Sequence, residues 1–226
     1  TMASNDDTEI VILRCEGRTF IAGADISEFG KPPQEPSLAT VLHALESFPK
    51  PILAAIHGTA LGGGLELALC CDYRLAIETA KVGLPEVNLG LLPGAGGTQR
   101  LPRLTGLKTA IDMITSGRPL NANDAQVAGI VDEVSGDDVA QAAMDFAEEL
   151  LRGGAGKRLT RDIPLQFNDD DTELLSGARD TIAKRLKGQT APQRILDCLN
   201  AAGTVPFEEG LKFERQTFEA CMADPQ

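Results

Sequence analysis

The chain has 226 residues, enough for one or two domains, and its 42% hydrophobic and 24% charged residues are typical of globular proteins. This composition excludes a disordered or fibrous protein. The net charge of −12 argues against general nucleic-acid binding, because that binding needs a clustered basic surface. A small anionic ligand is still compatible with the sequence, since residues 81–108 and 152–162 are each locally net positive.

Targeting and membrane signals are absent from the sequence. The five cysteines include no CxxC pair, and their odd number favours a reducing compartment. The first ten residues lack the basic start and apolar run of a secretory signal. The most apolar stretch, residues 51–71, contains His57, Glu66 and four glycines, which is not typical of a membrane span. We therefore expect a cytoplasmic protein without a membrane segment.

The first two-thirds of the chain alternates short apolar runs with helical patterns, which indicates an α/β fold. The predicted strands are 10–13, with 19–21 as a possible partner, 51–56, 73–77 and 130–134. The predicted helices are 37–48, a segment that follows Gly62–Gly64 and runs through Cys71, 96–116 and 122–128.

From Asp137 onward the pattern is helical. Apolar residues at 139, 142, 143, 146 and 150 have the spacing of an amphipathic helix, and further helices are predicted at 172–187, 191–202 and 206–222. On the last of these, the predicted apolar stripe consists of Phe207, Leu211, Phe218 and Met222. The sequence therefore predicts an α/β core over residues 1–136 and a helical region over residues 137–226.

Several site classes are excluded by their missing motifs. The two histidines, His43 and His57, have no HExxH spacing, so a metal site is not predicted. His57 ends a buried strand and is interpreted as a core histidine with satisfied polar atoms. The sequence contains neither the GxSxG of serine hydrolases nor a Walker-type loop or GxGxxG unit.

Two turns contain small residues that can expose backbone N–H groups. Residues 22–25 follow a predicted strand, and taken alone this segment is better explained as an ordinary turn with Asp25 as N-cap. Gly62–Gly64 precede a helix, so their N–H groups lie at the positive end of its dipole and can stabilise a developing oxyanion. A simple tight turn explains these three glycines about as well.

Two acidic residues accompany these turns. Glu66 lies in the first turn of the predicted helix, where a carboxylate also stabilises the helix dipole. Pro85 fixes the backbone directly before Glu86, which is one way to aim a carboxylate, although a surface loop acid is the ordinary interpretation of a single glutamate. A pair of carboxylates beside an anion-stabilising turn suits general acid–base chemistry at a polarised carbonyl.

The sequence resembles the crotonase (enoyl-CoA hydratase/isomerase) superfamily in ordered motifs over more than half of the chain. These are FIAGADISEF at 20–29, HGTALGGGLELALCCDYRLA at 57–76, GLPEVNLGLLPGAGGTQRLPRLTG at 83–106 and SGRPLNANDAQVAGIVDEV at 116–134. The variant HGTALGGGLELAL and residues 191–220 are most similar to the hydratase part of multifunctional fatty-acid β-oxidation enzymes. The resemblance implies a spiral of ββα units with a helical C-terminal region.

The resemblance also implies roles for single residues. Glu66 and Glu86 match the two glutamates of the hydratases in this family. The backbone N–H groups of Ala24 and Gly63 match its oxyanion hole around the thioester oxygen. The substrate-binding residues implied in the same way are Ala22, along the adenine nucleotide of CoA, Gly64 and Gly94.

The implied reaction is reversible syn addition of water to a trans-2-enoyl-CoA, which gives a 3-hydroxyacyl-CoA. Glu66 acts mainly as the base on water and Glu86 mainly delivers the proton to Cα, with no metal or redox cofactor. Two alternatives stay open, an isomerase that converts a 3-enoyl-CoA to a 2-enoyl-CoA and a truncated, non-catalytic acyl-CoA-binding module. The implied partners are the acyl-CoA substrate, a fused or separate 3-hydroxyacyl-CoA dehydrogenase, and further copies of the chain in a homo-oligomer.

The sequence departs from the family pattern at its start. Family members ordinarily have another strand–helix segment before the run EIVILR at 9–14, and that segment supplies part of the sheet and contacts to CoA. We therefore expect an open sheet edge at this strand, and we interpret the chain as an internal piece of a longer protein.

Overall fold

The structure of the chain, a computed structural model, describes residues 2–23, 35–186 and 188–224. The strands are β1 Val11–Arg14, β2 Ile52–Ile56, β3 Thr59–Leu61, β4 Tyr73–Ile77, β5 Lys81–Gly83, β6 Leu120–Asn121 and β7 Glu133–Ser135. The α-helices are α1 Leu38–Glu46, α2 Gly63–Cys70, α3 Gly97–Ser116, α4 Ala122–Val127, α5 Val139–Arg152, α6 Asp169–Arg185, α7 Ala191–Thr204 and α8 Phe207–Met222. Short 3-10 helices are η1 Met2–Ser4, η3 Glu86–Leu89 and η4 Thr160–Asp162.

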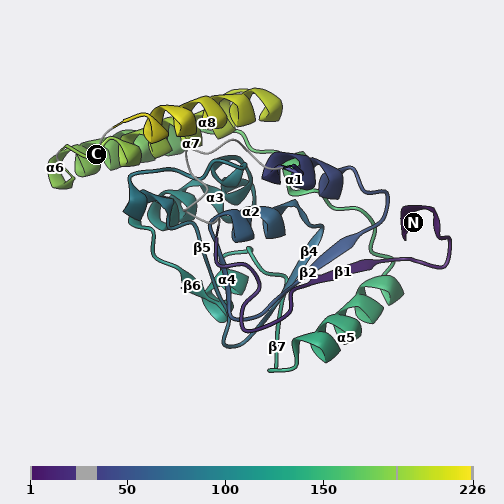
Figure 1. Ribbon diagram of the computed structural model, residues 1–226. Coiled ribbons are helices and arrows are strands. Elements are labelled where there is room, and N and C mark those ends of the chain that lie inside the picture. The colour runs from purple at the N-terminus through teal and green to yellow at the C-terminus, as the bar shows by residue number, and fades with distance from the viewer. Residues whose placement is uncertain (1, 24–34, 187, 225–226) are drawn as a thin grey trace.

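A four-stranded parallel sheet in the order β1-β2-β4-β7 lies at the centre of the fold (Figure 1). Every residue of β2 and β4 is buried, as expected for central strands of a parallel sheet. Because side chains alternate across a strand, Leu53 and Ala55 pack with α5 on one face, and Ile52, Ala54 and Ile56 belong to the larger core on the other. The predicted strand at 130–134 is displaced, since β7 begins only at Glu133.

A second, smaller sheet leads directly to the candidate site. Strands β3 and β5 are parallel, and β6 pairs antiparallel with β5. The sequence did not predict these strands, because two or three residues are too few for an alternating pattern. The predicted strand partner at 19–21 is wrong, since the segment forms only an isolated bridge between Ile21 and Ala60.

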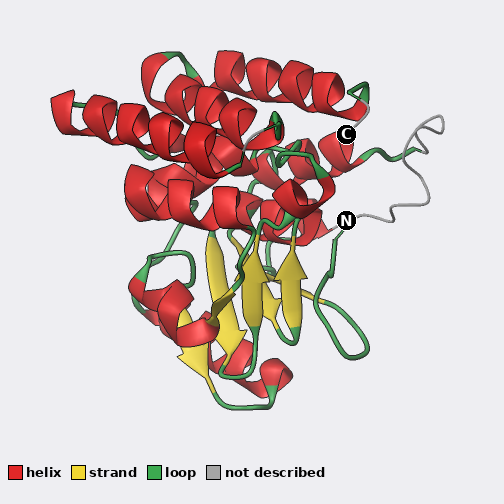
Figure 2. Cartoon of the chain, turned by 90° about the vertical axis from the view of Figure 1, so that its left-hand side faces the viewer, coloured by secondary structure: helices red, strands yellow, loops and turns green. Residues whose placement is uncertain are grey.

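Helices cover the large-core face of the sheet in two layers (Figures 1 and 2). Helices α2 and α3 pack with the core residues of the sheet, and α7 and α8 pack on α3 from the opposite side. Helix α3 is interrupted at Gly106, whose φ of 75° is not helical, so the predicted helix at 96–116 consists of two segments. This layering brings the C-terminal helices close to the start of α3.

The buried residues of α8 differ from the predicted apolar stripe. Gly210, Glu214 and Cys221 are buried, whereas Met222 is exposed and the other three members of the stripe are only half-buried. Helix α8 thus presents a glycine, a carboxylate and a thiol to the core rather than its larger apolar side chains. The buried carboxylate, Glu214, accepts hydrogen bonds from the start of α3, which explains why it is buried.

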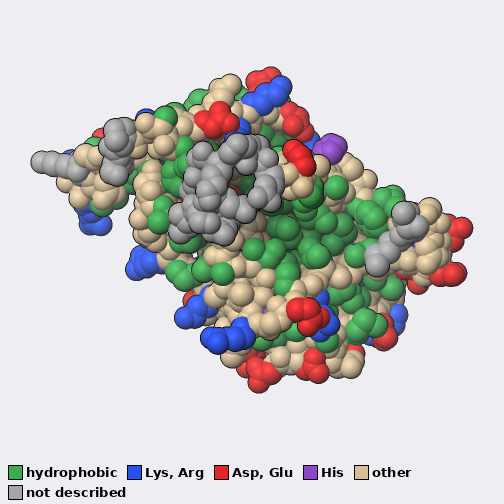
Figure 3. All heavy atoms as spheres, in the orientation of Figure 1, with side chains coloured by type: hydrophobic (Ala, Val, Ile, Leu, Met, Phe, Trp, Pro, Cys, Tyr) green, Lys and Arg blue, Asp and Glu red, His purple; other side chains and the backbone are tan. Residues whose placement is uncertain are grey.

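Helix α5 packs against β1, β2 and β4, on the face of the sheet opposite α2 and α3 (Figure 1). The predicted division between residues 1–136 and 137–226 stays a prediction. Strand β1 pairs with β2 alone among the described residues, and hydrophobic side chains gather at the surface between α1 and β1 (Figure 3). None of the described helices is long and apolar enough to span a membrane.

Candidate active site

The turn between β3 and α2 is shaped by Gly62. Its backbone angles, φ 53° and ψ −128°, are unfavourable for a residue with a side chain, and its N–H donates to the carbonyl of Gly83 at 2.9 Å. A Cβ atom here would lie 3.0 Å from Oε1 of Glu86. Gly62 therefore lets the chain enter α2 while the Glu86 carboxyl approaches the backbone.

The next two glycines differ from each other in their surroundings. Gly63 is the first residue of α2 and is partly exposed, and the first turn of a helix leaves its N–H groups without acceptors in that helix. Gly64 is buried, and a Cβ there would lie 2.3 Å from the carbonyl oxygen of Ile21. Close packing on Ile21 thus explains the glycine at 64, and its predicted contact with substrate stays a prediction.

The other predicted oxyanion and binding residues are only partly described. Ala24 lies outside the described residues, so its pairing with Gly63 in an oxyanion hole stays a prediction. Ala22 is exposed at the end of the segment that bridges to Ala60. Gly94 lies beneath the ring of Phe218, where a Cβ would approach that ring to 2.6 Å, and its predicted role in lining the site is likewise untested.

Glu66 is held in the first turn of α2 with 3% of its surface exposed. Its Oε1 accepts hydrogen bonds from the N–H groups of Ala95 at 2.7 Å and Gly97 at 2.8 Å. Burial raises the pKa of Glu66, while these two donors and the positive charge of Arg100 lower it. Burial outweighs these opposing contributions, so the pKa of Glu66 is raised on balance, and the two N–H donors fix the position of its carboxyl group.

Glu86 stands at the start of η3, directly after Pro85, in a contrasting environment. Its Oε2 is buried and has no hydrogen-bond partner in the described part of the chain. Burial, and next the negative charge of Glu66, raise the pKa of Glu86 to about 8. The structure thus brings the two predicted glutamates together, raises the pKa of both and gives them different hydrogen-bond environments.

A third carboxylate, Glu214 of α8, completes the cluster and was missed by the sequence analysis. It is 1% exposed and accepts hydrogen bonds from the N–H groups of Gly96 at 2.5 Å and Thr98 at 2.9 Å, and from the Thr98 hydroxyl. Burial, and next the charge of Glu66, raise its pKa to about 8. Its position four residues after the buried Gly210 and seven before the buried Cys221 is a helical spacing that could have revealed it.

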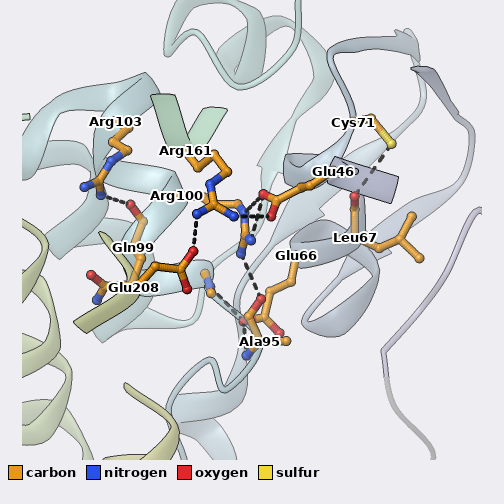
Figure 4. A network of polar contacts seen from close by, with 12 residues as sticks. Glu46, Glu66, Leu67, Cys71, Ala95, Gln99, Arg100, Arg103, Arg161 and Glu208 are labelled. Carbon is orange, nitrogen blue, oxygen red and sulfur yellow. Dashed lines mark hydrogen bonds and ion pairs between the residues drawn. The ribbon is translucent and has the colours of Figure 1, made fainter. Parts of the chain in front are cut away.

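A buried arginine, Arg100, joins the turn before α3 to helix α1 (Figure 4). The guanidinium of Arg100 donates to Glu46 of α1, with Nε–Oε1 and Nη2–Oε1 distances of 2.9 and 2.8 Å, and to the carbonyl oxygen of Ala95 at 3.1 Å. Arg161 contacts the same glutamate through Oε2 at 3.2 Å. Arg100 therefore fixes the turn that supplies hydrogen bonds to Glu66.

In the two net-positive segments, half of the cationic side chains form ion pairs with carboxylates of the chain itself. Arg100 and Arg161 pair with Glu46, and Lys157 pairs with the buried Asp72 at 2.9 Å. Arg158 donates to the Asp72 carboxylate through its backbone N–H and pairs with Asp132 through its side chain. Four of the eight cations in these two segments therefore pair with carboxylates of the chain itself.

His57 is mostly buried, and its Nε2 lies 3.2 Å from the carbonyl oxygen of Gly17, but its Nδ1 has no partner among the described residues. The prediction of a fully satisfied histidine is therefore correct for one ring nitrogen only.

In the described part of the chain, no group of three or more His, Cys, Asp or Glu side chains is placed to hold a metal ion. A cavity of about 1490 Å³ lies beyond Glu86, between η3, α3 and α6.

A pair of neighbouring glutamates with raised pKa values lies beside a glycine-shaped helix N-terminus in this layered α/β fold, an arrangement that defines an enzyme of the crotonase type. The chain belongs to the enoyl-CoA hydratase/isomerase family, whose profile matches residues 1–159. This finding confirms the predicted superfamily and its fold.

Individual relatives agree with this assignment. The chain is 40% identical over 219 residues to the peroxisomal bifunctional enzyme of Danio rerio and 42% identical over 210 residues to that of Homo sapiens. These matches cover 97% and 92% of this chain, which spans 30% and 29% of the two relatives. The crystal structure of an enoyl-CoA hydratase from Bacillus anthracis superposes with a TM-score of 0.61 at 31% identity, covering 99% of this chain and 76% of that one.

Proposed function

We propose that the chain is an enoyl-CoA hydratase that adds water reversibly, with syn geometry, across the double bond of a trans-2-enoyl-CoA. One observation carries the proposal: Glu66 is buried and accepts hydrogen bonds from two backbone N–H groups, whereas the partly buried Glu86 has an Oε2 without a partner among the described residues. Two carboxyl groups in different hydrogen-bond environments can serve as base and acid in the same turnover.

In the hydration direction, Glu66 accepts a proton from a water molecule held between the two glutamates. The hydroxide oxygen forms its bond to Cβ of the substrate as the π electrons move toward Cα and the thioester. Glu86, whose pKa of about 8 keeps it protonated at neutral pH, delivers its proton to Cα. One water is consumed and one C–O and one C–H bond form, so no redox partner is needed. Return of a proton from Glu66 to Glu86 restores both carboxyl groups for the next turnover.

Negative charge develops on the thioester oxygen during this addition. The N–H of Gly63, at the positive end of α2, is suited to stabilise it, and we assign Ala24 as the second donor from the family resemblance. Gly94 and Gly64 are proposed to border the acyl group, and Ala22 the adenine nucleotide. The proposal includes no metal or redox cofactor.

Three further proposals concern the setting of the reaction. The names of the vertebrate relatives describe bifunctional enzymes, which supports the proposal that this chain works with, or is fused to, a 3-hydroxyacyl-CoA dehydrogenase. A homo-oligomer stays a prediction. The cytoplasmic location also stays a prediction, whereas the names of the vertebrate relatives place those proteins in peroxisomes.

The test is incubation of the purified chain with crotonyl-CoA, followed by mass analysis of the product. A product heavier by one water, with the hydroxyl at Cβ, supports the hydratase. A chain that converts a 3-enoyl-CoA to a 2-enoyl-CoA faster than it hydrates the 2-enoyl-CoA is an isomerase. Binding of acyl-CoA without conversion of either substrate overturns the enzymatic proposal and identifies a binding module.

A further inference from the structure

Four consecutive backbone N–H groups at the start of α3 alternate between two carboxylates. Ala95 and Gly97 donate to Glu66 of α2, at 2.7 and 2.8 Å. Gly96 and Thr98 donate to Glu214 of α8, at 2.5 and 2.9 Å. The 95–98 segment is therefore held from two sides, and each carboxylate receives every second donor.

This alternation follows from the backbone at the start of α3. The first N–H groups of a helix have no acceptors within it and carry the positive end of the helix dipole, so they attract carboxylates. Gly96, with φ 99°, turns the chain so that successive N–H groups point to opposite sides. The Thr98 hydroxyl adds a further donor to Glu214.

We propose that Glu214 is a positioning residue for hydration: by fixing Gly96 and Thr98, it keeps the N–H groups of Ala95 and Gly97 converged on one oxygen of Glu66. The inference rests on the proposed function, because it assigns Glu66 as the base that acts on water. Glu214 itself acts only through this segment and through its charge.

A purely structural role, in which Glu214 only docks α8, is the competing explanation. Helix α8 has an independent attachment, because the ring of Phe207 lies among the guanidinium groups of Arg100, Arg103 and Arg161, with centroid distances of 5.2, 4.9 and 4.8 Å. Loss of the Glu214 contacts should therefore leave α8 in place while it releases the 95–98 segment. A test must therefore measure the rate of the reaction as well as the stability of the chain.

The charge of Glu214 provides a second observable, because it affects the pKa of neighbouring groups. The charged and titratable groups that interact with it are Glu66 on α2, Glu86 on η3, Arg100 on α3 and Cys198 on α7. Above about pH 8, where Glu214 is ionised, its negative charge contributes to the raised pKa of Glu86, after burial and Glu66. Removal of that charge should lower the pKa of Glu86, the proposed acid. Loss of a contact that only docks α8 would leave this pKa unchanged.

The experiment compares Glu214→Gln with Glu209→Gln, which changes an exposed glutamate in the same helix. For Glu214→Gln we expect kcat for crotonyl-CoA hydration to fall by about 10- to 100-fold, with KM within about twofold of the original, since the base is displaced without loss of the CoA contacts. The alkaline limb of the pH–rate profile should shift to lower pH. Glu209→Gln should match the unchanged chain in all three readings.

An unchanged kcat, or a lower kcat with an unmoved alkaline limb, overturns the positioning role. If Glu214→Gln does not fold, Thr98→Val removes one donor at constant shape and should lower kcat by about threefold with KM retained; no loss contradicts the proposal. If the unchanged chain does not hydrate crotonyl-CoA, the proposed function fails, and NMR titration of Glu66 and Glu86 in Glu214→Gln then tests the coupling. Carboxyl pKa values equal to those of the unchanged chain would overturn it.

Discussion

At the residue scale, Glu66 and Glu86 show how two identical side chains acquire different chemistry. Glu66 is buried where two N–H groups at the start of α3 converge on its Oε1, and these donors oppose the rise in its pKa that burial causes. Glu86 follows a proline in a short 3-10 helix, and its Oε2 has no partner in the described part of the chain. The local backbone around each carboxyl group therefore gives the two glutamates different hydrogen-bond partners.

This difference predicts the pH dependence of the reaction. Glu86 must carry a proton to protonate Cα, and its pKa is raised from 4.5 to about 8. We expect kcat/KM for hydration to be constant near neutral pH and to decrease above about pH 8, as Glu86 loses its proton. Initial rates of crotonyl-CoA hydration across this range provide the measurement. A rate that rises through this range would contradict the assignment of Glu86 as the acid.

A second prediction at this scale concerns Gly62. Gly62→Ala places a Cβ 3.0 Å from Oε1 of Glu86, at a φ of 53°. We expect the free energy of unfolding to fall by about 1–3 kcal/mol from backbone strain, and activity to fall because Glu86 is displaced. Urea unfolding and hydration rates measure both effects.

The matched control for this substitution is Gly177→Ala in α6, where an added Cβ meets no atom within 4 Å. Alanine is the better helix former, so this variant should gain about 0.5–1 kcal/mol and keep its activity. Equal behaviour of the two variants would show that the turn at Gly62 has no special role.

At the element scale, α8 closes the site although it comes last in the chain. It supplies Glu214 to the start of α3, and Phe207 in its first turn lies among three arginines. Two of these arginines also bind Glu46 of α1. The cluster therefore joins α1, α3 and α8 around the segment that holds Glu66.

This arrangement predicts a difference between two phenylalanines of α8. Phe207→Ala removes a ring packed against three guanidinium groups and should lower the free energy of unfolding by about 2 kcal/mol. Phe213→Ala removes a ring that is 40% exposed and should change it by no more than about 0.5 kcal/mol. Thermal or urea unfolding of both variants measures the two changes in the free energy of unfolding. Similar losses would mean that the arginine cluster does not stabilise α8.

At the scale of the whole molecule, the sequence predicted the elements that are long or wholly apolar. Strand β4 has the predicted bounds, Tyr73–Ile77, because its side chains are buried on both faces. The strands β3, β5 and β6 were missed, since each has only two or three residues and exists through its pairing. Single-sequence periodicity cannot detect an element that tertiary contacts create.

The candidate site was predictable to a similar extent. Glu66 and Glu86 were found because family motifs and the glycine-rich turn mark them. Glu214 was missed because an acidic residue in an amphipathic helix is ordinarily on the exposed side. Its donors at 96 and 98 are more than a hundred residues away in the sequence. The sequence could not indicate that these segments meet.

The buried acids also predict how the stability of the whole chain depends on pH. The pKa values of Glu86 and Glu214 are each raised from 4.5 to about 8, chiefly by burial. Between these values the folded chain holds protons that the unfolded chain has lost, so this contribution is complete below about pH 4.5 and lost as pH rises through about 8. We expect the free energy of unfolding to decrease by at least about 1 kcal/mol from about pH 5.5 to 7.5.

Urea titrations at the two pH values measure this change. The variant Glu86→Gln should show a smaller decrease, because one of the two titrating groups is gone. A chain whose stability increases over this interval would contradict the assignment of protonated carboxyl groups to the folded state.

The central claim is that Glu66 and Glu86 act together in hydration, and one kinetic comparison tests it most directly. It measures kcat/KM for crotonyl-CoA in the unchanged chain, Glu66→Gln, Glu86→Gln and the double variant, each shown to be folded. We predict a loss of about 100-fold or more in each single variant and little further loss in the double variant, because the two groups serve one step. An inactive unchanged chain, or either single variant with full activity, would contradict the account.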